Sequence, residues 1–356
     1  MCIIIVDMSR GKDLASLFGA TLVSLGTTMG PKLAVQTVYK TLFNKRITSE
    51  EPYRYSVDDF PGLKRDRHHF FSDDGQILVG YMYYYQEQPQ KGVVVMAHGF
   101  GGGGHLTYLD CANYLAKNGF YVFAYDATGN DESEGDGIIG FPEGIIDLNN
   151  AINYVESLDK FNNYPIMLFG HSWGAYSVCN VLYYHPEVKA VVAMSGFNNS
   201  ADLIRTQGHI YSNGGEEAVM PFIENHEKEL FGNWANSTAI RGFDSTKAHV
   251  FIVHSGDDKT VPYEAGYKIY YEKYKNNPRF TFRLFESKGH GTVYYSEEGM
   301  KYSLEWDDKW KSFLKSNPSE ENKKKFIADN INRAIWNDRL NHELFEEIIT
   351  FYNENL

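Results

Sequence analysis

Apolar and polar residues alternate in blocks along most of this chain. Short runs of apolar, often β-branched residues are separated by longer stretches in which apolar residues recur every third or fourth position. The short runs predict buried strands of a parallel sheet, and the longer stretches predict amphipathic helices. The predicted strands cover residues 93–97, 121–125, 166–169, 190–194, 249–254 and 280–285, and the predicted helices between them cover residues 106–117, 142–158, 175–184 and 263–274.

This alternation indicates an α/β fold with a mostly parallel central sheet and helices on both faces, because short connections pack each helix back onto the sheet. Two further strands, joined by a turn at Asp74-Gly75, precede it. From residue 197 to residue 246 the sequence has helical fragments and turn residues but no strong strand pattern. We interpret this interruption as a helical lid insertion above the carboxyl ends of the strands.

The pattern divides the chain into three parts. Residues 1–66 are predicted to form an N-terminal helical segment and linker, and residues 67–318 the α/β domain with its lid at about 197–246. Residues 319–356 are predicted to form C-terminal helices. These helices are expected to pack on the domain, because apolar residues recur at helical spacing in Leu344, Ile348 and Phe351.

The N-terminal segment is ambiguous. Residues 14–38 carry a single charge, that of Lys32, yet only about half of them are apolar and Pro31 interrupts the run, whereas a membrane-spanning helix needs about 20 predominantly apolar residues. We therefore expect a helix that packs on the domain or makes peripheral membrane contact. The alternative is a membrane anchor or export signal through residues 8–38.

Composition narrows the class of partner and the compartment. The 34 basic and 46 acidic residues give a formal net charge of −12, which disfavours nucleic acid as a partner. The cysteines, Cys2, Cys111 and Cys179, are too few and too scattered for a disulfide framework or a cysteine-rich metal site. This usage fits a reducing compartment, so a cytoplasmic location is predicted. The oligomeric state is left open.

The segment Gly170-His171-Ser172-Trp173-Gly174 lies between a predicted strand and a predicted helix. Gly-x-Ser-x-Gly in this context is typical of the sharp turn that presents a nucleophilic serine hydroxyl. Gly170 and Gly174 are expected because side chains there would clash with neighbouring elements. The hydroxyl of Ser172 then lies at a helix N-terminus, whose N–H groups favour a developing oxyanion. Trp173, directly after the serine, is expected to supply one of these N–H groups.

A serine hydroxyl is a weak nucleophile, so a histidine base and an orienting acid are also required. Asp257 and Asp258 follow the next-to-last predicted strand, and His290 follows the last one. Both loops lie at the carboxyl edge of the sheet, where Ser172 also lies. Among the 12 histidines only His290 combines this position with glycine neighbours on both sides. It is the predicted base, and either aspartate qualifies as the acid.

The first parallel strand runs into the loop His98-Gly99-Phe100-Gly101-Gly102-Gly103-Gly104. A loop this rich in glycine also suits phosphate binding. However, no Lys-Ser/Thr pair follows it as in a P-loop, and no Gly-x-Gly-x-x-Gly helix entry with an acidic partner is present. We therefore favour a loop that helps to bind an oxyanion.

Over residues 70–313 these segments resemble those of α/β-hydrolase esterases and lipases. Gly256-x-Asp258-x-x-Val261-Pro262 is similar to the acid segment of that family, and Gly289-His290 to its histidine segment. The resemblance implies that Asp258 is the acid, with Asp257 as the alternative.

The glycine-rich loop extends the resemblance. His98-Gly99 is similar to the His-Gly segment of lipases and esterases, which implies that the backbone N–H of Phe100 is the second oxyanion donor. The loop that begins at Asp126 resembles the family's Asp-x-x-Gly-x-Gly-x-Ser loop, but it has Asp131 where the family usually has glycine. This departure concerns the conformation of that loop and not the triad.

The resemblance implies an α/β-hydrolase fold and a serine hydrolase that cleaves a small-molecule carboxylic ester, as esterases and monoacylglycerol lipases do, through an acyl-enzyme intermediate. Neither a metal nor an organic cofactor is expected. A serine peptidase or amidase of the same fold is the enzymatic alternative, and a non-catalytic binding relative is the other, although such relatives usually lack a triad member. The lid residues expected to shape the substrate pocket are Arg205, His209, Phe231 and Trp234.

Overall fold

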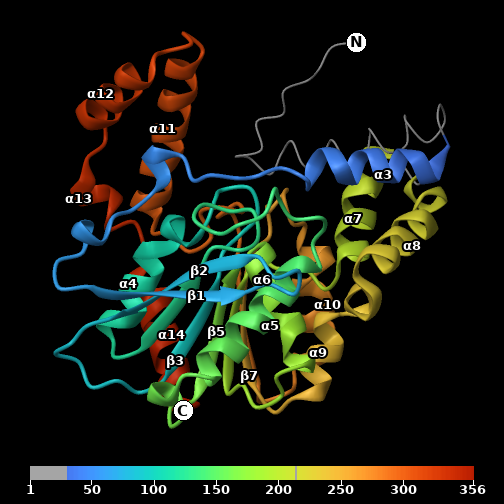
Figure 1. Cartoon of the computed structure of the whole chain (residues 1–356), viewed down its shortest axis with the longest axis horizontal. Helices are drawn as coiled ribbons and strands as arrows, with labels where there is room; N and C mark the ends of the chain where they lie inside the picture. The colour runs from blue at the N-terminus through green and yellow to red at the C-terminus, as the bar shows by residue number, and fades with distance from the viewer. Residues whose placement is uncertain (1–29, 213–214) are drawn as a thin grey trace.

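The computed structural model of the protein describes residues 30–212 and 215–356 and contains a central eight-stranded sheet in the order β1-β2-β4-β3-β5-β6-β7-β8 (Figure 1). β1 pairs antiparallel with β2, and β2 pairs antiparallel with β4. All pairings from β4 to β8 are parallel. The strands are β1 (Lys64–Phe71), β2 (Ile77–Tyr84), β3 (Val93–Ala97), β4 (Tyr121–Tyr125), β5 (Ile166–His171), β6 (Ala190–Met194), β7 (His249–Ser255) and β8 (Phe280–Phe285).

The strand order reverses at β3, which pairs with β4 on one side and with β5 on the other. In open parallel sheets, ligands bind at the carboxyl ends of the strands beside such a reversal. The loops that carry Gly99 and Ser172 both begin there, directly after β3 and β5. Every residue of β3 and β6 is buried, because helices cover the sheet on both faces.

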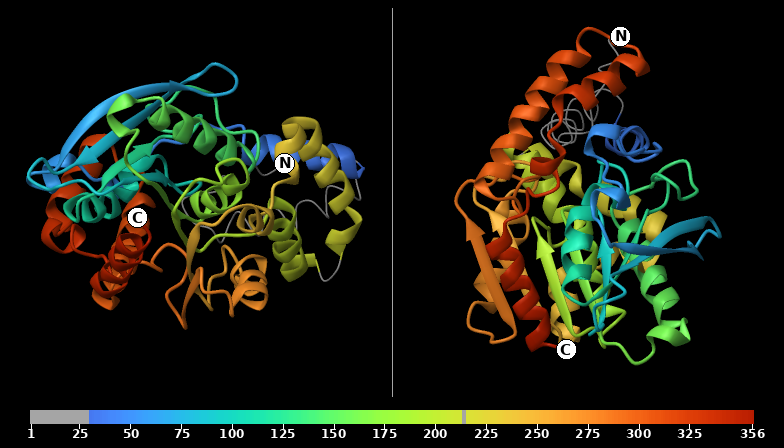
Figure 2. Two further views of the ribbon diagram at one scale, coloured as in Figure 1. Left: turned by 90° about the horizontal axis from the view of Figure 1, so that it is seen from below. Right: turned by 90° about the vertical axis from the view of Figure 1, so that its left-hand side faces the viewer.

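Two helical layers enclose the sheet (Figure 2). One hydrophobic core lies between the sheet and α5 (Glu143–Glu156), α6 (Trp173–Asn180), α9 (Ala239–Ser245) and α10 (Tyr267–Tyr274). The other lies between the sheet and α4 (Leu109–Lys117), α11 (Glu297–Leu314), α12 (Glu320–Asn330), α13 (Arg333–Trp336) and α14 (His342–Glu354). The Tyr352 hydroxyl of α14 donates to the Leu168 carbonyl of β5 at 2.7 Å, which ties the C-terminal helix directly to the sheet.

The segment between β6 and β7 is helical, with α7 (Ser200–Ser212), α8 (Met220–Phe231) and α9. An N-terminal helix, α3 (Pro31–Leu42), lies against α8 (Figure 1). The Tyr39 hydroxyl donates to the buried Glu227 carboxylate at 2.9 Å, and the Lys32 ammonium lies 3.6 Å from the Glu229 carboxylate. Helix α3 therefore packs on the helices inserted after β6.

The predicted fold class and the strand predictions are confirmed. Each predicted parallel strand corresponds to one of β3 to β8, and the two strands around Asp74-Gly75 are β1 and β2. The helix starts differ more: the stretches predicted from residue 106 and from residue 263 begin as 3-10 turns, and α4 and α10 start only at Leu109 and Tyr267.

The N-terminal prediction is tested only in part. Residues 14–29 of the predicted helix lie outside the described residues, and α3 begins at Pro31, whose missing N–H costs nothing in the first helical turn. Strand β1 begins at Lys64, a few residues before the predicted domain start at 67. Across residues 30–212 and 215–356, no helix has both the length and the apolar character that crossing a bilayer requires.

Candidate active site

Ser172 occupies a strained turn between β5 and α6. Its backbone has φ 58° and ψ −120°, a left-handed conformation that is costly for a residue with a side chain. Two glycines make the turn sterically feasible: a Cβ at Gly170 would lie 2.4 Å from the Gly174 carbonyl oxygen, and one at Gly174 would lie 2.0 Å from the Ala97 carbonyl oxygen. The Ser172 N–H donates to the Met194 carbonyl at 2.8 Å. Nucleophile elbows have a strand–turn–helix geometry of this kind.

Three side chains from different loops meet at this turn. The Ser172 hydroxyl lies 2.8 Å from Nε2 of His290, and Nδ1 of His290 lies 2.7 Å from Oδ2 of Asp258. The other carboxylate oxygen of Asp258 accepts the backbone N–H groups of Thr260 and Val261, each at 2.9 Å. Asp258 is buried, whereas the His290 side chain keeps 16% of its surface exposed. The arrangement orients the imidazole between the acid and the serine.

The protonation of Asp258 follows from its surroundings. Burial alone would raise the pKa of its carboxyl, but the neighbouring His290 ring, the hydrogen bond from it and the backbone N–H donors lower the pKa below its usual range. The carboxylate is therefore ionised and acts as an acceptor only. In that state it holds the N–H of the imidazole on Nδ1 and leaves the Nε2 lone pair facing Ser172.

The neighbouring Asp257 has a different set of contacts. Its Oδ1 accepts the Ser255 hydroxyl at 2.7 Å and the Gly289 N–H at 2.8 Å, and the Ser255 hydroxyl in turn accepts the Lys288 N–H at 2.7 Å. Asp257 thus fixes the backbone of the loop that carries His290. The structure brings Asp258, and not Asp257, against the imidazole.

The loop after β3 lies against the elbow. Nδ1 of the buried His98 ring is 2.8 Å from the Gly99 carbonyl oxygen, and its Nε2 accepts the Ala127 N–H at 3.0 Å. The Phe100 ring packs edge-on against the Trp173 ring at 5.9 Å. The N–H of Trp173 is among the first of α6, which have no intrahelical acceptor. The two residues predicted as oxyanion donors are therefore neighbours.

Two carboxylates from the loop after β4 hold this glycine-rich segment. Asp131 accepts the N–H groups of Gly104 at 2.8 Å and of Ser49 at 2.6 Å, and it also accepts the Ser49 hydroxyl. The buried Asp126 accepts the backbone N–H of His105 at 2.8 Å and lies 2.7 Å from Nδ1 of that ring. The sequence did not predict these contacts, although Asp131 had stood out as the departure from the family pattern.

The backbone of Asp131 explains that departure. Its φ is 35°, a left-handed value that glycine would adopt without strain. Asp is among the residues that tolerate this region best, and here the strain is offset by the hydrogen bonds that its carboxylate accepts. The loop thus keeps its conformation and gains a link to the N-terminal segment, where Ile47 bridges Asn130.

The four residues predicted to shape a substrate pocket lie in different surroundings. Arg205 of α7 pairs with Glu217 at 2.9 Å and with Glu224 of α8 at 3.5 Å, which occupies its guanidinium within the inserted helices. Trp234 packs against Tyr184 at 4.0 Å. Tyr184 follows α6 and the 3-10 turn after it, so Trp234 packs at the end of this helix that is remote from Ser172.

Phe231 and His209 complete this set. Phe231 is buried at the end of α8, so close to Gly140 that a Cβ there would lie 2.7 Å from the Phe231 ring. His209 is exposed on α7. Among the described hydrogen bonds and ring contacts, none joins these four residues to Ser172 or His290.

The aromatic residues around the loop after β3 come instead from segments that had no role in the prediction. Phe43, directly after α3, lies 5.7 Å from the Phe100 ring and 4.9 Å from the Phe141 ring. Phe141 in turn lies 5.3 Å from Phe197. These residues are far apart in sequence and have no shared spacing, so only the fold assembles them.

Other polar sites on the described residues lie elsewhere. Glu156, His185 and Glu187 place three ligand atoms within 4.8 Å of one another, but the two glutamates are exposed. Both nitrogens of His185 already have partners at 3.0 Å, Glu187 and Asn149. Nothing in this arrangement indicates a metal.

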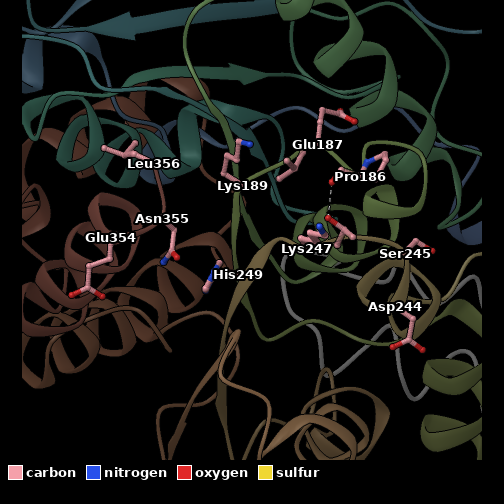
Figure 3. Close-up of a pocket in the computed structure, with 12 residues that line it drawn as sticks. Pro186, Glu187, Lys189, Asp244, Ser245, Lys247, His249, Glu354, Asn355 and Leu356 are labelled. Carbon is pink, nitrogen blue, oxygen red and sulfur yellow. Dashed lines mark hydrogen bonds between the residues drawn. The ribbon is translucent and has the colours of Figure 1, made fainter.

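An open pocket of about 770 Å³ lies at the opposite edge of the sheet (Figure 3). Lys189 and His249, at the amino ends of β6 and β7, line it together with the chain end at Leu356. Since Ser172 lies at the carboxyl ends of the strands, this pocket is separate from the candidate active site.

A mostly parallel sheet with a strained serine after its central strand defines the α/β-hydrolase fold. A family model described as "alpha/beta hydrolase fold" matches residues 92–233. A search of curated protein sequences gives no match. The match and the architecture agree that the chain has the α/β-hydrolase fold.

Two crystal forms of one esterase agree on the fold. An esterase from Pyrococcus furiosus is 20% identical, with a TM-score of 0.51, over 76% of this chain and 98% of that chain. A second crystal form of that esterase gives 18% identity and a TM-score of 0.53 over 76% and 97%. An acylaminoacyl peptidase from Pyrococcus horikoshii is 17% identical, with a TM-score of 0.48, over 66% of this chain and 39% of that one.

Proposed function

We propose that the protein is a serine hydrolase that cleaves small-molecule carboxylic esters through an acyl-enzyme intermediate. The observation that carries this proposal is the continuous hydrogen-bonded series from Asp258 Oδ2 through the His290 ring to the Ser172 hydroxyl, with distances of 2.7 and 2.8 Å. In this proposal Ser172 is the nucleophile, His290 the general base and Asp258 the acid that orients it.

In the acylation step, Nε2 of His290 removes the Ser172 proton while Oγ attacks the ester carbonyl carbon. The carbonyl π electrons move to oxygen, and the oxyanion is bound by the backbone N–H groups of Phe100 and Trp173. When the tetrahedral intermediate collapses, the bond to the leaving oxygen breaks and the His290 imidazolium donates its proton to that oxygen. The alcohol leaves, and the acyl group remains on Ser172.

Deacylation repeats these steps with water. His290 removes a proton from water, the resulting hydroxide oxygen attacks the acyl carbon, and the oxyanion again occupies the two N–H donors. Collapse returns the proton from His290 to Ser172 Oγ and releases the carboxylic acid. The proton transfer between Ser172 and His290 uses groups already within hydrogen-bond distance, and the steps described need no metal or organic cofactor.

The inserted helices are proposed to form a lid that selects the acyl or alcohol group. The buried Gln207 of α7 supports this, because its amide donates to the carbonyl oxygens of Lys259 at 3.0 Å and Thr260 at 2.6 Å. These two residues directly follow Asp258, so a movement of α7 would be felt at the acid. The N-terminal helix α3 packs on α8 and in this way also supports the lid.

Labelling with a fluorophosphonate probe tests the nucleophile. The wild type should react, Ser172→Ala should not, and Ser195→Ala should react as the wild type does. Ser195 is a matched control because it also has a positive φ, 54°, at the end of a neighbouring strand, but it is fully buried. Persistent labelling of Ser172→Ala would contradict the assignment.

A substrate panel then separates the reaction classes. p-Nitrophenyl esters of increasing acyl length should be hydrolysed by the wild type and not by Ser172→Ala. Cleavage of aminoacyl amides without cleavage of any ester would make the protein a peptidase or amidase. Absence of both labelling and hydrolysis would favour a non-catalytic binding protein. Fractionation of cells expressing the full chain tests the predicted cytoplasmic location against membrane attachment.

A further inference from the structure

A second hydrogen-bonded series lies behind the candidate triad. The backbone N–H of Gly99 donates to the Tyr108 hydroxyl oxygen at 3.2 Å. That oxygen lies 2.8 Å from Nδ1 of His171, and Nε2 of the same ring lies 3.0 Å from the backbone carbonyl oxygen of His290. The series therefore joins the oxyanion loop, the residue before Ser172 and the backbone of the predicted base.

The protonation of every member is determined by its neighbours. The His290 carbonyl only accepts, so Nε2 of His171 must carry the hydrogen. Burial, together with the nearby His290 ring, lowers the pKa of the His171 imidazole to about 3, so the ring is neutral and its Nδ1 is a bare acceptor. The Tyr108 hydroxyl therefore donates to Nδ1 and accepts from Gly99. Each hydrogen bond has one direction only.

A neutral His171 also suits its position beside the base. The His171 and His290 rings lie 4.9 Å apart. During ester hydrolysis His290 becomes a cation, and a second charge at that distance would oppose it. His171 is well placed to hold the backbone of His290 without competing for its proton, because it contacts the carbonyl group and not the reacting Nε2.

The Tyr108 hydroxyl lies equally close to the oxyanion loop. A Cβ at Gly99 would lie 2.5 Å from that hydroxyl and 3.4 Å from Cβ of Ser172. Gly99 directly precedes Phe100, whose N–H is the proposed oxyanion donor. A shift of the Tyr108 hydroxyl would therefore move the donor relative to the serine.

Resting on the proposed function, we infer that Tyr108 and His171 are positioning residues of the hydrolase reaction. The series Gly99–Tyr108–His171–His290 holds the backbone N–H of Phe100, the proposed oxyanion donor, and the ring of His290, the proposed base, in fixed positions relative to Ser172. Neither side chain touches the substrate. Their contribution is to the geometry of the transition state, and so it should affect the chemical step more than substrate binding.

Tyr108→Phe removes one hydroxyl and leaves Gly99 N–H and Nδ1 of His171 without partners. We expect kcat for a short-chain ester to fall about 10- to 100-fold while KM changes by less than about threefold. Tyr294→Phe is the matched control, because its ring also packs on His171, at 5.1 Å, while its hydroxyl is not part of the series. This control should keep kcat within about twofold of the wild type.

His171 is tested by a pair of variants. In His171→Gln a side-chain amide retains one donor and one acceptor, so part of the activity should survive. His171→Leu retains the bulk without either group and should lose more kcat than His171→Gln. Equal kcat for Tyr108→Phe and Tyr294→Phe, or for the two His171 variants, would overturn the inference. A wild type with neither probe reactivity nor ester hydrolysis would instead overturn the proposed function together with it.

A further measurement uses the wild-type protein alone and so does not depend on whether a variant folds. Nitrogen-15 NMR of the histidine rings in the wild-type protein should show His171 as a neutral ring protonated on Nε2 throughout the range from about pH 5 to about pH 9. A His171 ring that titrates in this range, or one that carries its hydrogen on Nδ1, would refute the series.

Discussion

Replacing Asp258 by asparagine is a direct test of the proposed triad, because the hydrogen bonds around this residue favour one orientation of the new amide. The carboxylate of Asp258 uses Oδ1 to accept two backbone N–H groups, of Thr260 and Val261, and Oδ2 to accept Nδ1–H of His290. An asparagine has only one acceptor oxygen. If this oxygen stays with the two N–H donors, the amide NH₂ faces Nδ1 of His290. The ring must then carry its hydrogen on Nε2, which faces Ser172 and is no longer a base.

The size of the effect follows from the two orientations of the amide. In the inactive tautomer the loss of kcat should approach about 10⁴-fold, which corresponds to about 5 kcal/mol. The flipped amide would restore the active tautomer, but it leaves two buried N–H donors unpaired at about 1–3 kcal/mol each. The flipped orientation is therefore less stable by about 2 kcal/mol or more. The population of the inactive orientation should exceed that of the flipped one by at least about 30-fold. We expect kcat for Asp258→Asn to fall between about 30-fold and about 10⁴-fold.

The neighbouring residue supplies the control. Asp257 accepts the Ser255 hydroxyl and the Gly289 N–H through the same oxygen, Oδ1, and an asparagine oxygen can keep both bonds. Asp257→Asn should therefore stay within about threefold of the wild type. Initial rates on a p-nitrophenyl ester, with circular dichroism to verify folding, compare the two variants. A greater loss in Asp257→Asn than in Asp258→Asn would refute the assignment of the acid.

Three further predictions concern the surrounding structure. Gly104→Ala should prevent folding or abolish activity, because its Cβ would lie 1.8 Å from the Asp126 carboxylate. Gly102→Ala in the same loop should be tolerated, because its Cβ would meet nothing within 4 Å. Soluble yield and the rate of ester hydrolysis compare the two variants. Phe43→Ala, at a fully buried ring, should cost about 3–5 kcal/mol in urea unfolding, and a cost under about 1 kcal/mol would contradict the packing. Burial raises the pKa of the Glu227 carboxyl from 4.5 to about 7, so folding takes up a proton between these values and stability falls as pH rises through them. Between pH 4.5 and pH 8, the free energy of unfolding of Glu227→Gln should therefore rise by up to about 3 kcal/mol relative to that of the wild type. A difference in melting temperature between the two proteins that does not change with pH would refute this.

The sequence predicted the sheet and the tight turn at Ser172 because both depend on local signals. Apolar runs marked the parallel strands, and Gly170 and Gly174 marked a turn that admits no side chain. The acid could not be chosen from the residues alone, since Asp257 and Asp258 are adjacent. The choice depends on which carboxylate the N–H groups of Thr260 and Val261 face, and this is a property of the folded turn.

The contacts of the inserted helices were harder to predict for a related reason. From the sequence, Arg205 was predicted to help shape the substrate pocket. In the structure its guanidinium pairs with Glu217 and Glu224, which come from other turns of the inserted helices. Phe43 lies outside the segment that resembles the family, and it reaches Phe100 only because α3 packs back across the domain. Contacts between distant segments leave no periodic signal in the sequence.

The link between Asp131 and Ser49 has a consequence for how the molecule folds. The two residues are 82 positions apart, so their hydrogen bonds can form only after a long loop has closed. The same carboxylate holds Gly104, next to the loop that is proposed to bind the oxyanion. On refolding, strands and helices with local contacts should appear first, and catalytic competence should recover later, when the N-terminal segment reaches its place. The slow event would be the arrival of the segment around Ser49, although that segment precedes the sheet along the chain.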